Sequence, residues 1–134
     1  MALYLLKTEP TVYSYSDLER EKAVWDGVTS PGGLFQIKTA RKGDVAFIYH
    51  TGGEKQVVGI CEIITDPYID PKAGNPKIFM FDIKPKRRLP TPVTLEQIKK
   101  DKRTCDSRIV REARLSVQPV DEKVWNAILQ MSGL

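Results

Sequence analysis

Three polar side chains with hydrogen-bonding chemistry stand together where a strongly apolar stretch ends. Tyr49, His50 and Thr51 bring a phenol, the only histidine of the chain and a hydroxyl beside two glycines. The preceding residues, 45–49, are β-branched, aromatic or small on both alternating faces, which is typical of a buried central strand. Polar groups at the end of such a strand could bind a ligand, although a histidine there could equally make a structural hydrogen bond.

Trp25 is the second candidate, because an indole offers a flat surface on which an aromatic ligand can stack. It precedes Asp26 and Gly27, where a backbone could approach a ligand closely, and then a turn-rich loop over 29–33 whose two glycines could adopt positive φ. The alternative is that Trp25 belongs to the core. Trp125, the other tryptophan, lies on the apolar stripe of an expected terminal helix, and we predict that it is a core residue.

Local spacing supports neither a catalytic set nor a metal site. The single histidine has no evident orienting partner for nucleophilic catalysis. With two cysteines and no Cys-x-x-Cys pair, a zinc site is not expected. The paired glycines that follow Thr51 are not followed by the Gly-Lys-Ser/Thr of a phosphate loop. We therefore expect no metal and no cofactor. We also expect that the two cysteines are reduced thiols and that the protein is cytoplasmic.

Positive charge is concentrated in one third of the chain, although the net charge is only +4. Residues 72–114 carry 13 Lys/Arg against 5 Asp/Glu, whereas residues 1–71 carry 7 against 10. Such clustering suits a polyanion, most simply nucleic acid, and a solvated surface is the alternative. The candidate contacts to a phosphate backbone are Lys86, Arg87, Arg88, Lys99, Lys100, Lys102 and Arg103.

The chain is expected to form one domain, 1–134, and to be a monomer. No apolar run approaches the roughly 18 residues of a membrane span. The apolar start lacks a basic leading segment and is expected to be the first strand, not a signal peptide. Strands are expected over 3–6, 24–28, 44–50, 57–64, 78–83 (closed by Pro85) and 115–120.

Helix signals separate these strands. A capping box with Ser16 as N-cap and Glu19 three residues later predicts a short helix from Asp17. Thr94 and Gln97 predict a second one in the same way. Helical turns are expected within 34–42 and 107–112, and a terminal helix is expected after Asp121. Consecutive strands joined by hairpins favour an α+β fold, a curved or closed, mostly antiparallel barrel with short flanking helices.

Several segments, in this order, resemble the EVE domain of the PUA-like superfamily. The main ones are Tyr4-Leu5-Leu6-Lys7-Thr8-Glu9-Pro10, Trp25-Asp26-Gly27-Val28, Phe47-Ile48-Tyr49-His50-Thr51, Val57-Val58-Gly59-Ile60-Cys61-Glu62 and Val110-Arg111-Glu112-Ala113-Arg114-Leu115-Ser116-Val117. The resemblance implies a PUA-like barrel related to the YTH readers. It also implies a pocket for a single nucleobase, with modified cytosines as the proposed ligands, and a reader with no catalytic role.

Carried over by position, the resemblance implies a specific set of pocket residues. They are Lys7, Trp25, Val28, Ser30, Tyr49, His50, Thr51 and Arg111. The chain departs from the family pattern where Ser30 and Leu34 replace an asparagine and an arginine, and where Ile78 replaces a tryptophan. A serine cannot reproduce the paired donor and acceptor of an amide, so the specificity of the pocket is expected to differ.

We therefore expect a domain without catalytic activity that binds DNA or RNA and reads a modified base. One alternative is an enzyme acting on a nucleobase or nucleotide. Another is a protein-interaction module, whose pocket would stay empty and whose basic third would bind no nucleic acid.

Overall fold

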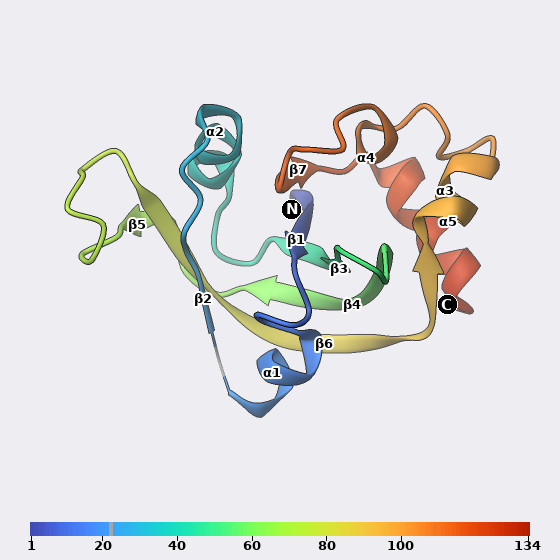
Figure 1. The fold of residues 1–134 in the computed structure, drawn as a ribbon, viewed down its shortest axis with the longest axis horizontal. Coiled ribbons are helices and arrows are strands. Elements are labelled where there is room, and N and C mark those ends of the chain that lie inside the picture. The colour runs from blue at the N-terminus through green and yellow to red at the C-terminus, as the bar shows by residue number, and fades with distance from the viewer. Residues whose placement is uncertain (22) are drawn as a thin grey trace.

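A computed structural model gives the fold and describes residues 1–21 and 23–134. One curled sheet runs through the molecule, with short helices packed around it (Figure 1). The elements in chain order are β1 (Leu3–Thr8), α1 (Tyr15–Arg20), β2 (Ala23–Trp25), α2 (Pro31–Thr39), β3 (Val45–His50), β4 (Gln56–Ile63), β5 (Tyr68–Ile69), β6 (Phe79–Thr94), α3 (Leu95–Lys100), α4 (Arg108–Arg111), β7 (Val117–Pro119) and α5 (Glu122–Ser132).

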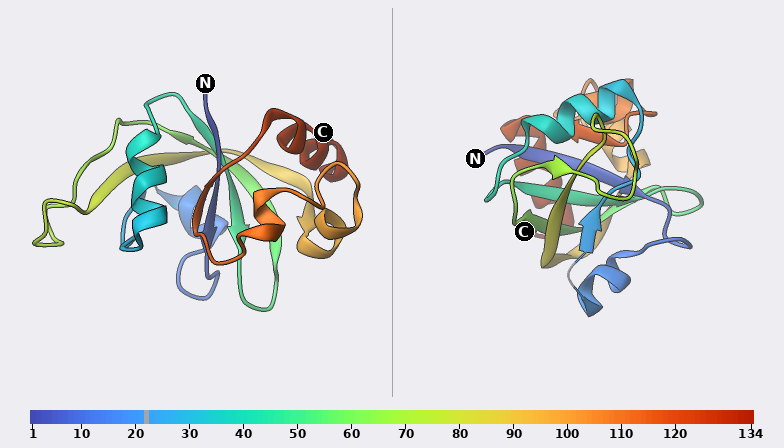
Figure 2. Two further views of the ribbon diagram at one scale, coloured as in Figure 1. Left: turned by 90° about the horizontal axis from the view of Figure 1, so that it is seen from above. Right: turned by 90° about the vertical axis from the view of Figure 1, so that its left-hand side faces the viewer.

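The strand order is β2-β6-β4-β3-β1-β7, with β5 beside β6. β3 and β4 pair antiparallel, which confirms the predicted hairpin. β1 and β3 run parallel, because the α1–β2–α2 segment crosses over between them. The other pairings within the described chain are antiparallel. The expected mostly antiparallel barrel is thus confirmed as a curled half-barrel, whose end strands are β2 and β7 (Figure 2).

β3 is the buried centre of the sheet, as its sequence predicts, and all six of its residues are buried. Alternation along the strand sends Phe47 into a core beneath α5 and Ile48 into a second core on the opposite face. Trp125 stacks on Phe47 with ring centroids 3.8 Å apart, which confirms that Trp125 is a core residue. Burial on both faces is the reason that this strand is apolar throughout.

β6 corrects the prediction of a strand over 78–83 closed by Pro85. It continues through three prolines to Thr94. The β4–β6 register shifts between Val57 and Gly59 and again between Ile60 and Cys61. A proline has no backbone N–H to donate to a neighbouring strand. It is therefore tolerated in a strand at a bulge, where no ladder hydrogen bond is required from that position.

The start of α1 is also corrected. Ser14, not Ser16, is the N-cap, because its Oγ accepts from the backbone N of Asp17 at 3.2 Å while Asp17 accepts from the backbone N of Ser14 at 2.8 Å. The backbone N–H of Tyr15 is bound by His50 Nε2 at 3.0 Å, which ties the first turn to the end of β3. The same capping motif thus occurs two residues earlier than predicted, where tertiary contacts support it.

Residues 31–33 of the predicted loop over 29–33 instead form the first turn of α2. Ser30 is the N-cap and Pro31 occupies the first helical position. Gly32 and Gly33 do not take the positive φ that was expected. Gly33 is needed for space, since a Cβ there would lie 2.6 Å from Val28 Cγ1.

The remaining helices follow their signals. The capping box of Thr94 and Gln97 begins α3, as predicted. α4 confirms the helical turn expected within 107–112. Asp121 is the N-cap residue of α5, although its side chain makes no capping bond.

Tyr15 attaches α1 to the sheet. Its ring lies against Gly59 of β4, where a Cβ would come within 2.2 Å of Tyr15 Cε1. The phenol donates to the carbonyl oxygen of Ile60 at 2.7 Å, and the side chain is only 1% exposed. This burial raises the pKa of Tyr15 to about 12. Gly59 is therefore required because an aromatic ring occupies the space that a side chain would take.

We predict that Gly59→Ala lowers the free energy of unfolding by about 2 kcal/mol or more, because the ring must shift in a packed core. Urea unfolding measures this change. Gly53→Ala is the matched control, since a Cβ at Gly53 meets no atom within 4 Å; its effect should stay within about 0.5 kcal/mol. Equal stability of the two variants would contradict this account of α1 docking.

Candidate ligand-binding cavity

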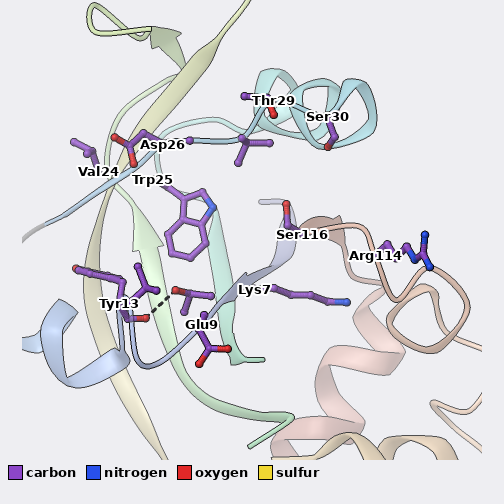
Figure 3. A pocket seen from close by; sticks show the side chains of 14 residues that line it. Lys7, Glu9, Tyr13, Val24, Trp25, Asp26, Thr29, Ser30, Arg114 and Ser116 are labelled. Carbon is purple, nitrogen blue, oxygen red and sulfur yellow. Dashed lines mark hydrogen bonds between the residues drawn. The ribbon is translucent and has the colours of Figure 1, made fainter. Parts of the chain in front are cut away.

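A cavity with a volume of about 710 Å³ lies at one end of the described part of the sheet. It opens where β1 ends, β2 leads into α2, and the loop between α4 and β7 comes alongside (Figure 3). This is the gap in the half-barrel, between the β2 end of the sheet and the β1–β7 end. Its lining residues are Lys7, Thr8, Glu9, Val12, Tyr13, Val24, Trp25, Asp26, Gly27, Val28, Thr29, Ser30, Arg114 and Ser116.

The eight predicted pocket residues are divided by the structure. The cavity is lined by Lys7, Trp25, Val28 and Ser30. The residues that lie outside its lining are Tyr49, His50, Thr51 and Arg111. The base-binding role of the first four stays a prediction, and the others have different surroundings.

Trp25 reaches the cavity from β2, where it pairs with Phe81 of β6. Its indole projects from the strand toward the space bounded by Lys7 and Ser116 (Figure 3). Only 8% of the residue is exposed, and it belongs to the core cluster that also contains Leu6. This burial supports the alternative that Trp25 belongs to the core. Trp25 serves the core, and it also forms one wall of the cavity.

His50 has a structural hydrogen-bonding role. Because its Nε2 accepts from the backbone N of Tyr15 at 3.0 Å, Nδ1 carries the proton and donates to Glu54 Oε1 at 2.9 Å. The residue is 6% exposed. Both ring nitrogens are thus occupied, and the imidazole joins the end of β3 to the start of α1.

The other three predicted pocket residues outside the cavity lining also have different surroundings. Tyr49 is 4% exposed and lies in the core beneath α5. The backbone N of Thr51 donates to the carbonyl oxygen of Thr8 at 2.9 Å. Arg111 is exposed at the end of α4. Because successive side chains of a strand point to opposite faces, Tyr49 and His50 are separated although they are adjacent in the sequence.

Polar groups on the cavity wall come from both ends of the sheet. Ser30 Oγ accepts from the backbone N of Gly33 at 3.2 Å, so its proton can still be donated to a ligand. Lys7 Nζ donates to the carbonyl oxygen of Ala113 at 2.6 Å. Partial burial lowers the pKa of Lys7. Arg114 and Ser116 were not predicted, because only the tertiary fold brings this loop to the cavity.

The seven candidate phosphate contacts differ in how their charge is used. Those in ion pairs are Arg88 with Glu19, Lys100 with Glu96 and Arg103 with Asp101. The other four, Lys86, Arg87, Lys99 and Lys102, are exposed, and no ion pair is formed by them within the described residues. The second set is therefore the better placed to meet a polyanion.

Two further classes of site are not found in the part of the chain that the structure describes. No group of three or more His, Cys, Asp or Glu residues could hold a metal ion there. None of its helices has both the length and the apolar character needed to cross a membrane.

We predict that Trp25→Ala lowers the free energy of unfolding by about 3 kcal/mol or more, because a large buried side chain is lost. Trp25→Phe should cost less, since most of the apolar volume remains. Thermal and urea unfolding measure both. If Trp25→Ala were as stable as wild type, the indole would not be part of the core.

Comparison with known proteins agrees with this fold. A model of the EVE domain family matches residues 2–131. A Rhodopseudomonas palustris protein solved by NMR is 37% identical, with a TM-score of 0.94 over 99% of this chain and 94% of that one. An Agrobacterium tumefaciens crystal structure is 30% identical, with a TM-score of 0.96 over 100% of this chain and 94% of that one.

More distant similarity extends to animal proteins. Thymocyte nuclear protein 1 of Danio rerio is 25% identical over 97% of this chain and 71% of its own length. The structure of human THYN1 protein in complex with 5-methylcytosine-containing DNA is 21% identical, with a TM-score of 0.90 over 100% of this chain and 99% of that one, and it supports the fold. With a family model matched from residue 2 to residue 131 and the same curled half-barrel, the chain belongs to the EVE domain family.

Proposed function

We propose that this chain is a nucleic-acid-binding domain that captures one modified cytosine in the cavity beside Trp25 and leaves the base chemically unchanged. The cavity carries the proposal: its volume of about 710 Å³ lies in the usual range for small ligands, and it combines an indole wall with the cations of Lys7 and Arg114. Human THYN1, which shares this fold, is known in complex with DNA containing 5-methylcytosine. Methylated cytosine in DNA is therefore the ligand to test first.

The energetics of base capture agree with this lining. A base must first leave its stack, which costs a few kcal/mol. Contact with an aromatic wall returns about 1–3 kcal/mol, and Val28 adds apolar surface for a methyl group. The hydroxyls of Ser30 and Ser116 can hydrogen-bond to the edge of the base. Because these terms nearly cancel, binding should depend strongly on the fit of the base and on contacts to its phosphates.

The test uses Trp25 as its own reporter. In a Trp125→Phe variant, Trp25 is the single tryptophan, so a base bound in the cavity should change the remaining indole fluorescence. Short single-stranded DNA with one 5-methylcytosine should give a saturable change at lower concentration than the same strand with cytosine. Chromatography of the recovered strand should show the base unchanged.

A matched variant separates capture from general attraction. Val28→Thr keeps the shape of the side chain but places a hydroxyl against the ligand, so it should reduce the preference for the methylated strand. If the fluorescence of Trp25 stays constant while a labelled strand binds, the base does not enter this cavity. Recovery of a strand with a chemically altered base would instead favour the alternative that the protein is an enzyme.

We also predict that Lys86 and Arg87 of β6, for which no ion pair is found among the described residues, strengthen DNA binding through their charge. Reversing Lys86 and Arg87 to Glu should weaken DNA binding and make the affinity less dependent on salt, because fewer counterions are released. The control reverses Lys72 and Lys77, two exposed lysines of the loop between β5 and β6. Fluorescence anisotropy at several salt concentrations measures both; equal salt slopes would show that Lys86 and Arg87 lie on a solvated surface.

A further inference from the structure

The loop between α4 and β7, residues 112–116, is held in place from the strands beneath it. Lys7 of β1 makes two of these bonds: its backbone N donates to the carbonyl oxygen of Ser116 at 2.9 Å and its Nζ to that of Ala113 at 2.6 Å. Gln118 of β7 donates from Nε2 to the carbonyl oxygen of Glu112 at 2.6 Å. Both ends of the loop are therefore fixed to the sheet.

The helix side of the loop is also in contact. A Cβ on Gly32, in the first turn of α2, would lie 3.3 Å from Leu115 Cδ1. The backbone N of Leu115 donates to the carbonyl oxygen of Glu112 at 3.0 Å, which closes a turn within the loop. The side chain of Leu115 thus lies close to the first turn of α2.

The ammonium of Lys7 is engaged within the protein. It lies 5.5 Å from the ring centroid of Tyr49, its neighbour across the parallel β1–β3 pair. Among the described residues, no carboxylate comes within ion-pair distance of it. The carbonyl oxygen of Ala113 is the acceptor that its geometry provides, and a charged donor makes this hydrogen bond strong.

Arg114, the next residue along the loop, is placed differently. It is exposed and lines the cavity, and in the view of Figure 3 its guanidinium points outward, away from Trp25 and Ser116. Within the described chain, no hydrogen bond or ion pair involves its guanidinium. A guanidinium offers five N–H donors in a planar fork that matches a phosphate group.

We infer that Lys7 is a positioning residue that fixes the 112–116 loop, and that Arg114 makes the phosphate contact beside the captured base. The inference rests on the proposed function for the role of Arg114. It assigns the two cations at the cavity unequal tasks: the ammonium of Lys7 binds the protein's own carbonyl, and the guanidinium of Arg114 binds the ligand.

A double-mutant cycle tests this division with single-stranded DNA containing one 5-methylcytosine. Arg114→Gln should weaken binding several-fold and reduce the salt slope by about 0.7, the value for one phosphate contact. Lys7→Met removes the donor but keeps an apolar stem, and it should cause a similar loss. The double variant should lose no more than either single variant, because both changes remove the same contact. Lys77→Met, at an exposed loop lysine, is the control for loss of one charge.

If Lys7 itself contacts a phosphate, the two losses add, and the salt slope of the double variant falls by about 1.4. Additivity would overturn the positioning role. Lys7→Arg keeps a charged donor at this position and should restore binding relative to Lys7→Met.

A second measurement needs no ligand. Amide hydrogen exchange at Leu115 reports opening of the loop, because this N–H is bonded within it. Lys7→Met should accelerate the exchange about tenfold or more, and Arg114→Gln should leave it unchanged. Unchanged exchange in Lys7→Met overturns the positioning role, whatever its binding. If the wild type binds no DNA, the proposed function and the role of Arg114 fall together, while exchange still decides the role of Lys7.

Discussion

The parallel pairing of β1 and β3 determines where the other elements of the fold can lie. Parallel strands end at the same edge of a sheet, so Lys7 and Thr8 lie beside Tyr49 and His50. The pairing also requires a crossover, and here the crossover consists of α1, β2 and α2. β2 then joins the opposite end of the sheet from β7, and the cavity lined by Trp25 lies between these two ends.

Alternation along the two central strands explains how the residues at this edge are used. Tyr49 is on the face of Lys7, where its ring lies beneath the ammonium. His50 is on the opposite face and binds the first turn of α1. Residues that looked like one cluster in the sequence thus belong to two sides of the sheet. The histidine contributes indirectly, because it anchors the segment that carries Tyr13 into the cavity lining.

The cations of the chain likewise have two kinds of role: some hold elements of the fold together, and others stay exposed on the surface. Arg88 covers the ring of Tyr15 and pairs with Glu19, so it helps to hold α1 on the sheet. Lys86 and Arg87, in the same basic cluster, stay exposed. This difference is the physical basis for assigning phosphate contacts to some cations and packing roles to others. The cavity lining contains none of these three β6 cations, and the phosphate contact beside it is assigned to Arg114 in the proposed function.

The sequence was sufficient to predict the features that depend on local patterns. Apolar alternation located the central hairpin, capping residues located α3 and α5, and the stripe of the last helix placed Trp125 in the core. It also carried the family resemblance. Other features follow from the three-dimensional fold: the passage of β6 through its prolines, the hydrogen bonds to both ring nitrogens of His50, the burial of Trp25 and the position of Arg114 at the cavity. The reason is that these depend on which backbone groups remain unpaired and on which distant segments meet, and neither is encoded in a local pattern of residues.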